Sequence, residues 1–232
     1  MAPFDRRRIG KLLTPVIEVA YPPRCPECGL RGCWVCADCL AATPLFAEPR
    51  CPICSLPLTH DTCACDELPN RIDRLWVAGP YDGWLRRAIY QFKFSGETAR
   101  GPHLASMLVP GCAGLDDDVV IVPVPLHRTR QRSRGYDQVA IIASELSELA
   151  GRPLTSCLVK TRETQAQVGL GAAERSLNLW DAFAVEPGIG APPKVLLVDD
   201  VLTTGATMTE CARALRREGT SWVGAVAIAH GL

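Results

Sequence analysis

The chain has 232 residues and no net formal charge, since 25 lysines and arginines balance 25 aspartates and glutamates. Hydrophobic residues make up 47% of the sequence and charged residues 22%, which is ordinary for a globular protein and excludes a fibrous or disordered chain. The neutral charge argues against binding nucleic acid through bulk charge, although it leaves room for a local basic patch.

The N-terminal segment predicts a helix rather than a targeting signal. Three consecutive arginines (residues 6–8) precede a short apolar stretch that is interrupted by Pro15 and Glu18, and no small-residue cleavage site follows. No apolar run in the chain reaches the ~18–20 residues of a membrane span. We therefore expect an N-terminal helical segment over residues 1–21 and a cytoplasmic protein without a membrane span.

Cysteines are concentrated in the next part of the chain, where residues 25–65 hold nine of the twelve. In a cytoplasmic protein, close cysteine pairs are typical of metal ligands rather than of disulfides. Zn²⁺ takes four such ligands in a tetrahedral site. The simplest pairing predicts two structural zinc sites, one made by Cys25, Cys28, Cys36 and Cys39 and the other by Cys51, Cys54, Cys63 and Cys65.

The cysteine spacing leaves other pairings open. Cys33 lies three residues before Cys36 and could replace Cys39, and an interleaved arrangement, in which the first pair joins the third, fits the spacing as well. In each case zinc would fold a stretch that is too short to bury a core unaided. A purely structural role and a binding role for this zinc module both stay open.

The composition changes near residues 66–72, where the cysteines and prolines give way to alternating strand and helix patterns. We expect strands at 75–81, 119–124, 194–198 and 222–229, and helices at 84–94, 138–151 and 207–217. Apolar strands that alternate with helices predict a parallel α/β sheet. The expected organisation is a zinc module over residues 22–68 and an α/β domain over residues 69–232, each with its own core.

The strand that begins near residue 194 leads into the most specific pattern, V-L-L-V-D-D-V-L-T-T-G-A-T-M over residues 195–208. In open α/β sheets, ligands bind at the carboxyl ends of the strands. Asp199 and Asp200 would accept hydrogen bonds from sugar hydroxyls or hold Mg²⁺ through water. The small residues that follow open a helix, and their backbone N–H groups suit a phosphate. This expected anion loop consists of Thr203, Thr204, Gly205, Ala206 and Thr207.

A basic segment directly follows the strand at 119–124. Its guanidinium groups could hold a diphosphate through paired hydrogen bonds, and they would also suit the backbone of a nucleic acid. We expect a basic loop that contains Arg128 and the DNA-contact candidates Arg130, Arg132 and Arg134.

Residues 162–183 predict a mobile loop that closes over a site, because small and polar residues occur there without a regular period. The candidate residues of this covering loop are Arg162, Thr164, Gln167, Arg175 and Asn178. Lys93, at the end of the helix at 84–94, could reach a phosphate, although the helix dipole also favours a lysine there.

The run at 195–208 resembles the phosphoribosyl-diphosphate (PRPP) signature of type I phosphoribosyltransferases. From about residue 22 to residue 230, the chain resembles the ComF family of competence-associated proteins, in which a double zinc ribbon precedes a phosphoribosyltransferase-like domain. Further matching runs are I-Y-Q-F-K-F-S-G, T-Q-A-Q-V-G-L and R-Q-R-S-R-G-Y-D-Q. In the last of these, Asp137 stands where the family usually has asparagine.

The resemblance implies that PRPP binds together with Mg²⁺ and that Asp199, Asp200 and Arg128 contribute to catalysis. It implies a phosphate contact for Lys93 and a diphosphate-binding loop made of Pro125, Leu126, His127 and Arg128. The motifs do not give the acceptor of the phosphoribosyl group. Two alternatives stay open, namely a non-catalytic protein that handles single-stranded DNA with the DNA-uptake machinery, and a sensor that binds PRPP without chemistry.

Overall fold

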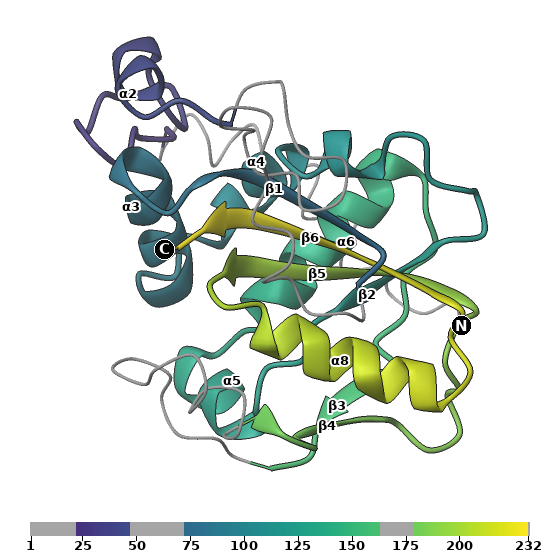
Figure 1. Cartoon of the computed structure of the whole chain (residues 1–232). Coiled ribbons are helices and arrows are strands. Elements are labelled where there is room, and N and C mark those ends of the chain that lie inside the picture. The colour runs from purple at the N-terminus through teal and green to yellow at the C-terminus, as the bar shows by residue number, and fades with distance from the viewer. Residues whose placement is uncertain (1–21, 47–71, 163–178, 232) are drawn as a thin grey trace, which may run out of the picture.

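The structure is a computed structural model, and it describes residues 22–46, 72–162 and 179–231. Its centre is a parallel four-stranded sheet with the strand order β1-β6-β5-β2 (Figure 1). These strands are β1 Arg74–Pro80, β2 Val120–Pro123, β5 Lys194–Leu202 and β6 Trp222–His230. A second sheet pairs two short antiparallel strands, β3 Leu158–Lys160 and β4 Phe183–Val185. The parallel α/β fold expected from the sequence is confirmed.

Helices lie on both faces of the parallel sheet. Figure 1 shows α8 (Ala206–Arg217) in front of the sheet and α6 (Gln138–Ala150) behind it. Among the described helices, none has the length and apolar character needed to cross a membrane. The other helices are α2 Ala37–Ala42, α3 Gly83–Phe94, α4 Gly101–Ser106 and α5 Arg128–Arg134, with the 3₁₀ turns η2 Thr98–Arg100 and η3 Val109–Cys112.

Two sequence-based expectations need correction. β5 continues four residues beyond its expected end because its pairing with β6 runs on through Val201 and Leu202, so Asp199 and Asp200 lie within the strand. The arginine-rich segment after β2 is the helix α5 rather than a loop, and His127 caps its first turn. The β3–β4 pair was not predicted, because three-residue strands are too short to show an alternating pattern.

The core lies between the parallel sheet and its helices. β6 is buried along its seven central residues. From α3, Trp84, Ile89 and Phe92 enter the core, and each is at most 1% exposed. Burying a large apolar side chain contributes about 1.5–3 kcal/mol, and strands that are apolar on both faces need helices on both sides. The burial of apolar side chains on both faces of the sheet therefore explains both the apolar strands and the helices that cover them.

The cysteine-rich segment packs directly on the α/β domain. Val35, Leu45 and Phe46 contact the main core. The indole nitrogen of Trp84 in α3 donates a 2.8 Å hydrogen bond to the carbonyl oxygen of Thr43. The described residues of the cysteine-rich segment therefore share a contact surface with the core of the α/β domain.

A buried arginine also connects the cysteine-rich segment to the domain. Arg100 is 1% exposed, and its guanidinium donates to the carbonyl oxygens of Arg24 and Trp34, both at 3.2 Å. The same group lies 2.6 Å from Glu97 and 4.9 Å from the ring centroid of Trp34. A buried charge is tolerated when it is paired and fully hydrogen-bonded in this way. Arg100 thus fixes the segment on η2 and α3.

Candidate functional site

A cavity of about 370 Å³ opens where the parallel strands end. The carboxyl ends of β2 and β5 meet there with the last turn of α3 and the first turns of α6 and α8. In open α/β sheets, this edge is where ligands bind. The cavity brings together eight of the residues predicted to bind PRPP, namely Lys93, Pro125, Leu126, His127, Asp199, Asp200, Thr203 and Thr207.

The carboxylate of Asp200 is held from two neighbouring helices. Its side chain is 7% exposed, and its Oδ1 lies 2.7 Å from Nζ of Lys93 in α3. Its Oδ2 accepts a 3.2 Å hydrogen bond from Nε2 of Gln138, which is buried in the first turn of α6. Because both oxygens of Asp200 are bonded, the direction of this carboxylate is fixed before any ligand enters.

Asp199 is a carboxylate with a perturbed protonation equilibrium. Burial and the neighbouring Asp200 carboxylate raise the pKa of Asp199 from 3.8 to about 7, although Lys93 acts in the opposite direction. The negative form of Asp199 therefore has too little positive charge around it, and a cation or a hydroxyl donor in the cavity would stabilise it. Paired carboxylate oxygens of this kind fit Mg²⁺, which prefers oxygen ligands.

The residues after β5 form a turn that opens α8. Gly205 is the N-cap of α8 and has left-handed backbone (φ 72°), which glycine adopts without strain. The N-cap residue has no side chain, and the backbone N–H groups at a helix N-terminus point toward the cavity side where an anion is favoured. Thr203 and Thr207 line the cavity beside this turn, Ala206 is buried, and Thr204 is partly exposed.

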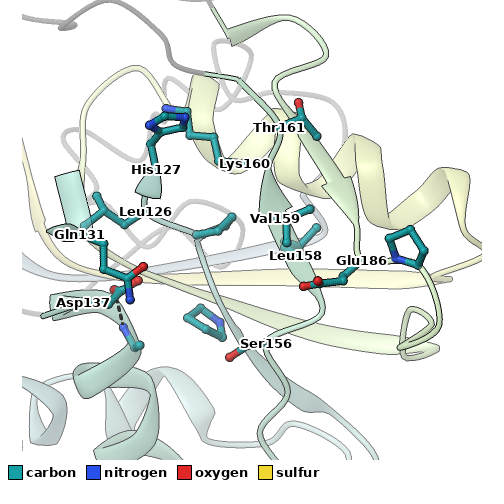
Figure 2. A pocket seen from close by; sticks show the side chains of 14 residues that line it. Leu126, His127, Gln131, Asp137, Ser156, Leu158, Val159, Lys160, Thr161 and Glu186 are labelled. Carbon is teal, nitrogen blue, oxygen red and sulfur yellow. Dashed lines mark hydrogen bonds between the residues drawn. The ribbon is translucent and has the colours of Figure 1, made fainter. Parts of the chain in front are cut away.

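A second cavity of about 620 Å³ adjoins the first through residues 125–127 and Lys160. In Figure 2, His127 and Lys160 lie toward one end of the cavity, and Asp137 and Glu186 lie on opposite sides of it. Burial raises the pKa of Asp137. The hydrogen bonds that its carboxylate accepts from backbone N–H groups of α6 act in the opposite direction. The two carboxylates and the lysine give the second cavity a mixed charge, with positive charge near the first cavity.

The arginine candidates lie on α5, which places them differently from a loop. Arg134 lines the first cavity, and its guanidinium lies 4.8 Å from the ring centroid of Phe94. Arg132 is exposed. Since residues two apart on a helix do not face each other, Arg132 and Arg134 point in different directions. Arg128 and Arg130 also lie on this helix, at its first and third positions.

The predicted covering loop lies mostly outside the described residues. Arg162 is exposed and donates a 2.8 Å hydrogen bond to the carbonyl oxygen of Trp180. Leu179 and Ala182 are fully buried, so the end of the expected loop belongs to the core. The candidates Thr164, Gln167, Arg175 and Asn178 lie outside the described residues.

Several side chains of the cavities were not predicted as ligand-binding residues, and Gln138, Lys160 and Glu186 are the ones that bear on the chemistry. Gln138 orients Asp200, Lys160 lines both cavities, and Glu186 follows β4. Gln138 stands at the first position of a predicted helix, so the position of that helix at the sheet edge would have indicated it. Lys160 ends the short strand β3, with its ammonium 5.4 Å from the ring centroid of Phe183, and nothing in its local sequence signals this place.

Four cysteines of the N-terminal segment form one cluster. The sulfur atoms of Cys25, Cys28, Cys36 and Cys39 all lie within 4.8 Å of one another, and they could hold a metal ion such as zinc. Cys33 is not part of this cluster, and its sulfur lies 3.9 Å from the carbonyl oxygen of Leu30. The geometry favours the simplest pairing over the one that uses Cys33. The second predicted set, Cys51, Cys54, Cys63 and Cys65, lies outside the described residues.

The protonation of the cluster is compatible with a bound cation. Burial acts to raise the pKa of Cys25, but hydrogen bonds from backbone N–H groups outweigh it and lower this pKa to about 6. The adjacent Cys36 raises the pKa of Cys39 well above its ordinary value. Four thiolates cannot share so small a volume without positive charge, which a divalent metal would supply.

The comparisons with known proteins gave several clear relatives. The chain is 33% identical over 203 residues to DNA utilization protein YhgH from Escherichia coli, covering 83% of this chain and 88% of that protein. It is 32% identical over 197 residues to Competence protein F from Haemophilus influenzae, covering 80% of this chain and 85% of that protein. It is 29% identical over 190 residues to Competence protein ComFC from Streptococcus pneumoniae, covering 80% of this chain and 82% of that protein. No model of a known protein family matches the chain.

Solved structures resemble the chain over a smaller part. One is an allosteric regulatory enzyme of purine biosynthesis, with a TM-score of 0.41 and 19% identity, covering 59% of this chain and 29% of the enzyme. Another is the adenine phosphoribosyl transferase from Trypanosoma brucei, with a TM-score of 0.38 and 13% identity, covering 59% of this chain and 55% of that one.

The fold and the site define a parallel α/β protein with a cysteine cluster and a carboxylate-lined cavity at the sheet edge. The sequence relatives extend over most of the chain and of their own lengths. The chain therefore belongs to the ComF family of competence and DNA utilization proteins, and the resemblance found in its motifs is confirmed.

Proposed function

We propose that the chain binds PRPP with Mg²⁺ in the cavity at the ends of β2 and β5 and transfers the phosphoribosyl group to an acceptor. The observation that carries this proposal is a single cavity that holds paired carboxylates, Asp199 and Asp200, beside the N-terminus of α8. The carboxylates suit neighbouring hydroxyls, and the helix N-terminus suits a phosphate. A sugar phosphate carries both groups, and the motif resemblance supports PRPP among such ligands.

Each part of the ligand has a proposed partner. The backbone of residues 203–207 binds the 5′-phosphate, and Asp199 and Asp200 accept hydrogen bonds from the ribose hydroxyls. Residues 125–128 bind the diphosphate, for which Arg128 supplies positive charge. A Mg²⁺ ion bound with the diphosphate supplies further positive charge for the leaving group. Lys93 holds Asp200 in place and adds positive charge at the cavity wall.

The proposed reaction exchanges one bond at the anomeric carbon. The bond to the diphosphate oxygen breaks, the diphosphate leaves with the bonding electrons, and a nucleophile of the acceptor forms the new bond. The carboxylates fix the ribose, while Arg128 stabilises the negative charge that develops on the leaving group. Binding of the unreacting 5′-phosphate positions the carbon that reacts, so no protein nucleophile is required.

We further propose a structural zinc ion at Cys25, Cys28, Cys36 and Cys39, and a second one at the four cysteines from Cys51 to Cys65. The division into a zinc module over residues 22–68 and a phosphoribosyltransferase domain over residues 69–232 belongs to the same proposal. The short distances among the four described sulfur atoms support it.

A second candidate function is the handling of single-stranded DNA without catalysis. It is favoured by the names of the relatives, which refer to DNA utilization and to competence. A protein of this kind would bind DNA with a strong dependence on salt and would release no diphosphate from PRPP.

Calorimetry with PRPP and Mg²⁺ tests the first proposal. Replacing Asp199→Asn together with Asp200→Asn should weaken binding by at least about tenfold, or about 1.4 kcal/mol. Asp116→Asn is the matched control, because this exposed carboxylate pairs with Lys194 at the opposite end of β5. A screen of amines, amides and nucleobases for diphosphate release then identifies the acceptor. Unchanged affinity in the folded double variant, or no PRPP binding by the wild-type protein, would refute the proposal.

A further inference from the structure

Two large aromatic side chains on α3 point to solvent. Tyr90 is 58% exposed and Phe94 is 59% exposed, and their ring centroids lie 4.9 Å apart with the rings tilted by 48°. They are four residues apart, so they share one face of the helix. The opposite face already packs into the core through Trp84, Leu85, Ala88, Ile89 and Phe92. Tyr90 and Phe94 therefore contribute little to the core, and their exposure needs another reason.

Arginines lie on both sides of this aromatic pair. Arg86 and Arg87 are exposed and lie about one turn before Tyr90, and Arg87 pairs with Glu27 at 2.9 Å. At the other end, the guanidinium of Arg134 in α5 lies 4.8 Å from the ring centroid of Phe94. We call this surface the aromatic stripe, and it consists of Arg86, Arg87, Tyr90, Phe94 and Arg134.

The aromatic stripe continues into a hollow at the end of α3. This hollow has a volume of about 320 Å³, and its lining includes Phe94, Arg134 and Tyr136. Lys93 and Arg134 line both the hollow and the cavity proposed for PRPP. The stripe and the proposed PRPP site are therefore neighbouring parts of one surface, and a phosphate-rich ligand on the stripe would lie close to the PRPP cavity.

We propose that the aromatic stripe is a docking surface for single-stranded nucleic acid. Unpaired bases present flat aromatic faces that stack on Tyr90 and Phe94, and the phosphates between them pair with Arg86 and Arg134. A duplex hides its base faces and would lose the stacking contacts. The chain as a whole is neutral, so attraction of the backbone depends on a local group of cations of this kind. This inference rests on the second candidate function and is independent of phosphoribosyl transfer.

The test measures binding of a fluorescently labelled oligodeoxythymidylate to the full chain at low and moderate salt. The double replacement Tyr90→Ala with Phe94→Ala should weaken binding by about tenfold or more, because stacking on an aromatic ring contributes about 1–3 kcal/mol per base. Phe94→Trp should preserve binding, whereas Phe94→Leu keeps an apolar side chain without an aromatic face and should not. Leu149→Ala removes an apolar side chain of similar exposure (52%) from α6 and should have no effect.

The outcomes distinguish a failure of the aromatic stripe from a failure of the DNA-handling function. If the wild-type protein binds no oligonucleotide, both the second candidate function and the stripe are refuted. If it binds and the double alanine variant binds equally well, the DNA function stands and the stripe is refuted. If Phe94→Leu binds as well as Phe94→Trp, or if the alanine variant dissociates a wild-type dimer, the stripe is an apolar contact and base stacking is refuted. Circular dichroism and thermal unfolding of each variant verify that the domain remains folded.

Discussion

Replacing Asp199 with asparagine should stabilise the protein at alkaline pH while removing a ligand contact. The structure places Asp199 beside a second carboxylate in a partly buried position, and its pKa is raised to about 7. Asparagine has nearly the same shape and carries no charge. Its side-chain oxygen can still accept the 2.8 Å hydrogen bond that the N–H of Asp200 donates to Oδ1 of Asp199.

The sign and size of this effect follow from the pKa of Asp199. Because the pKa is raised on folding, the native protein binds more protons than the unfolded chain between about pH 4 and about pH 7, and its stability falls as the pH rises through that window. A shift from 3.8 to about 7 corresponds to at most on the order of 4 kcal/mol. Lys93 and solvent reduce part of this electrostatic cost. We therefore expect Asp199→Asn to raise the free energy of unfolding by about 1–3 kcal/mol at about pH 8.

Thermal unfolding at two pH values measures this gain without any ligand. The melting temperature of Asp199→Asn should exceed that of the wild type by roughly 3–8 °C at about pH 8, and the two should agree at about pH 4. The control is Asp116→Asn, since Lys194 lowers the pKa of Asp116 and its removal should give no stabilisation. An Asp199→Asn variant that is less stable than the wild type at both pH values would show that Asp199 is not an unfavourable buried charge.

Three further predictions concern the rest of the chain. Cys39→Ser should lower the zinc content measured by elemental analysis by about one ion per chain, whereas Cys33→Ser should leave it unchanged, because only Cys39 belongs to the described cluster. Arg100→Leu should destabilise the α/β domain by roughly 3 kcal/mol in urea unfolding, since it leaves buried carbonyl oxygens without a donor. Gly205→Ala should cost about 1–2 kcal/mol of stability and weaken PRPP binding in calorimetry, because its backbone is left-handed.

The large elements of the fold could be predicted because each is long enough to show a period. The helices at 84–94 and 138–151 and the four strands of the parallel sheet agree with the structure to within a few residues at each end. The short elements could not be predicted. α5 is the clearest case, since its seven residues include four arginines and no apolar stripe, and only the caps at His127 and Gly135 mark its ends.

The part of the site that belongs to one strand and the loop after it could be predicted from the sequence. The part that several elements form together was harder to predict. Asp199, Asp200 and residues 203–207 follow each other in the sequence, so their common place at the sheet edge follows from the sheet alone. Lys160 and Glu186 reach the cavities from a hairpin whose two strands are 22 residues apart in sequence. Such contacts depend on tertiary packing, which local patterns do not encode.

The helix α3 connects the three parts of the molecule to which we assign functions. Its first residues hold the cysteine-rich segment, through Trp84 to Thr43 and through Arg87 to Glu27. Its last turn places Lys93 2.7 Å from Asp200 in the cavity that we propose for PRPP. The exposed face between these ends carries the aromatic stripe. Because a helix moves largely as one body, loss of zinc from the cysteine cluster should shift the Lys93–Asp200 pair as well. A zinc-depleted chain that remains folded should therefore bind PRPP more weakly than the zinc-loaded chain, although none of the four clustered cysteines lines the cavity.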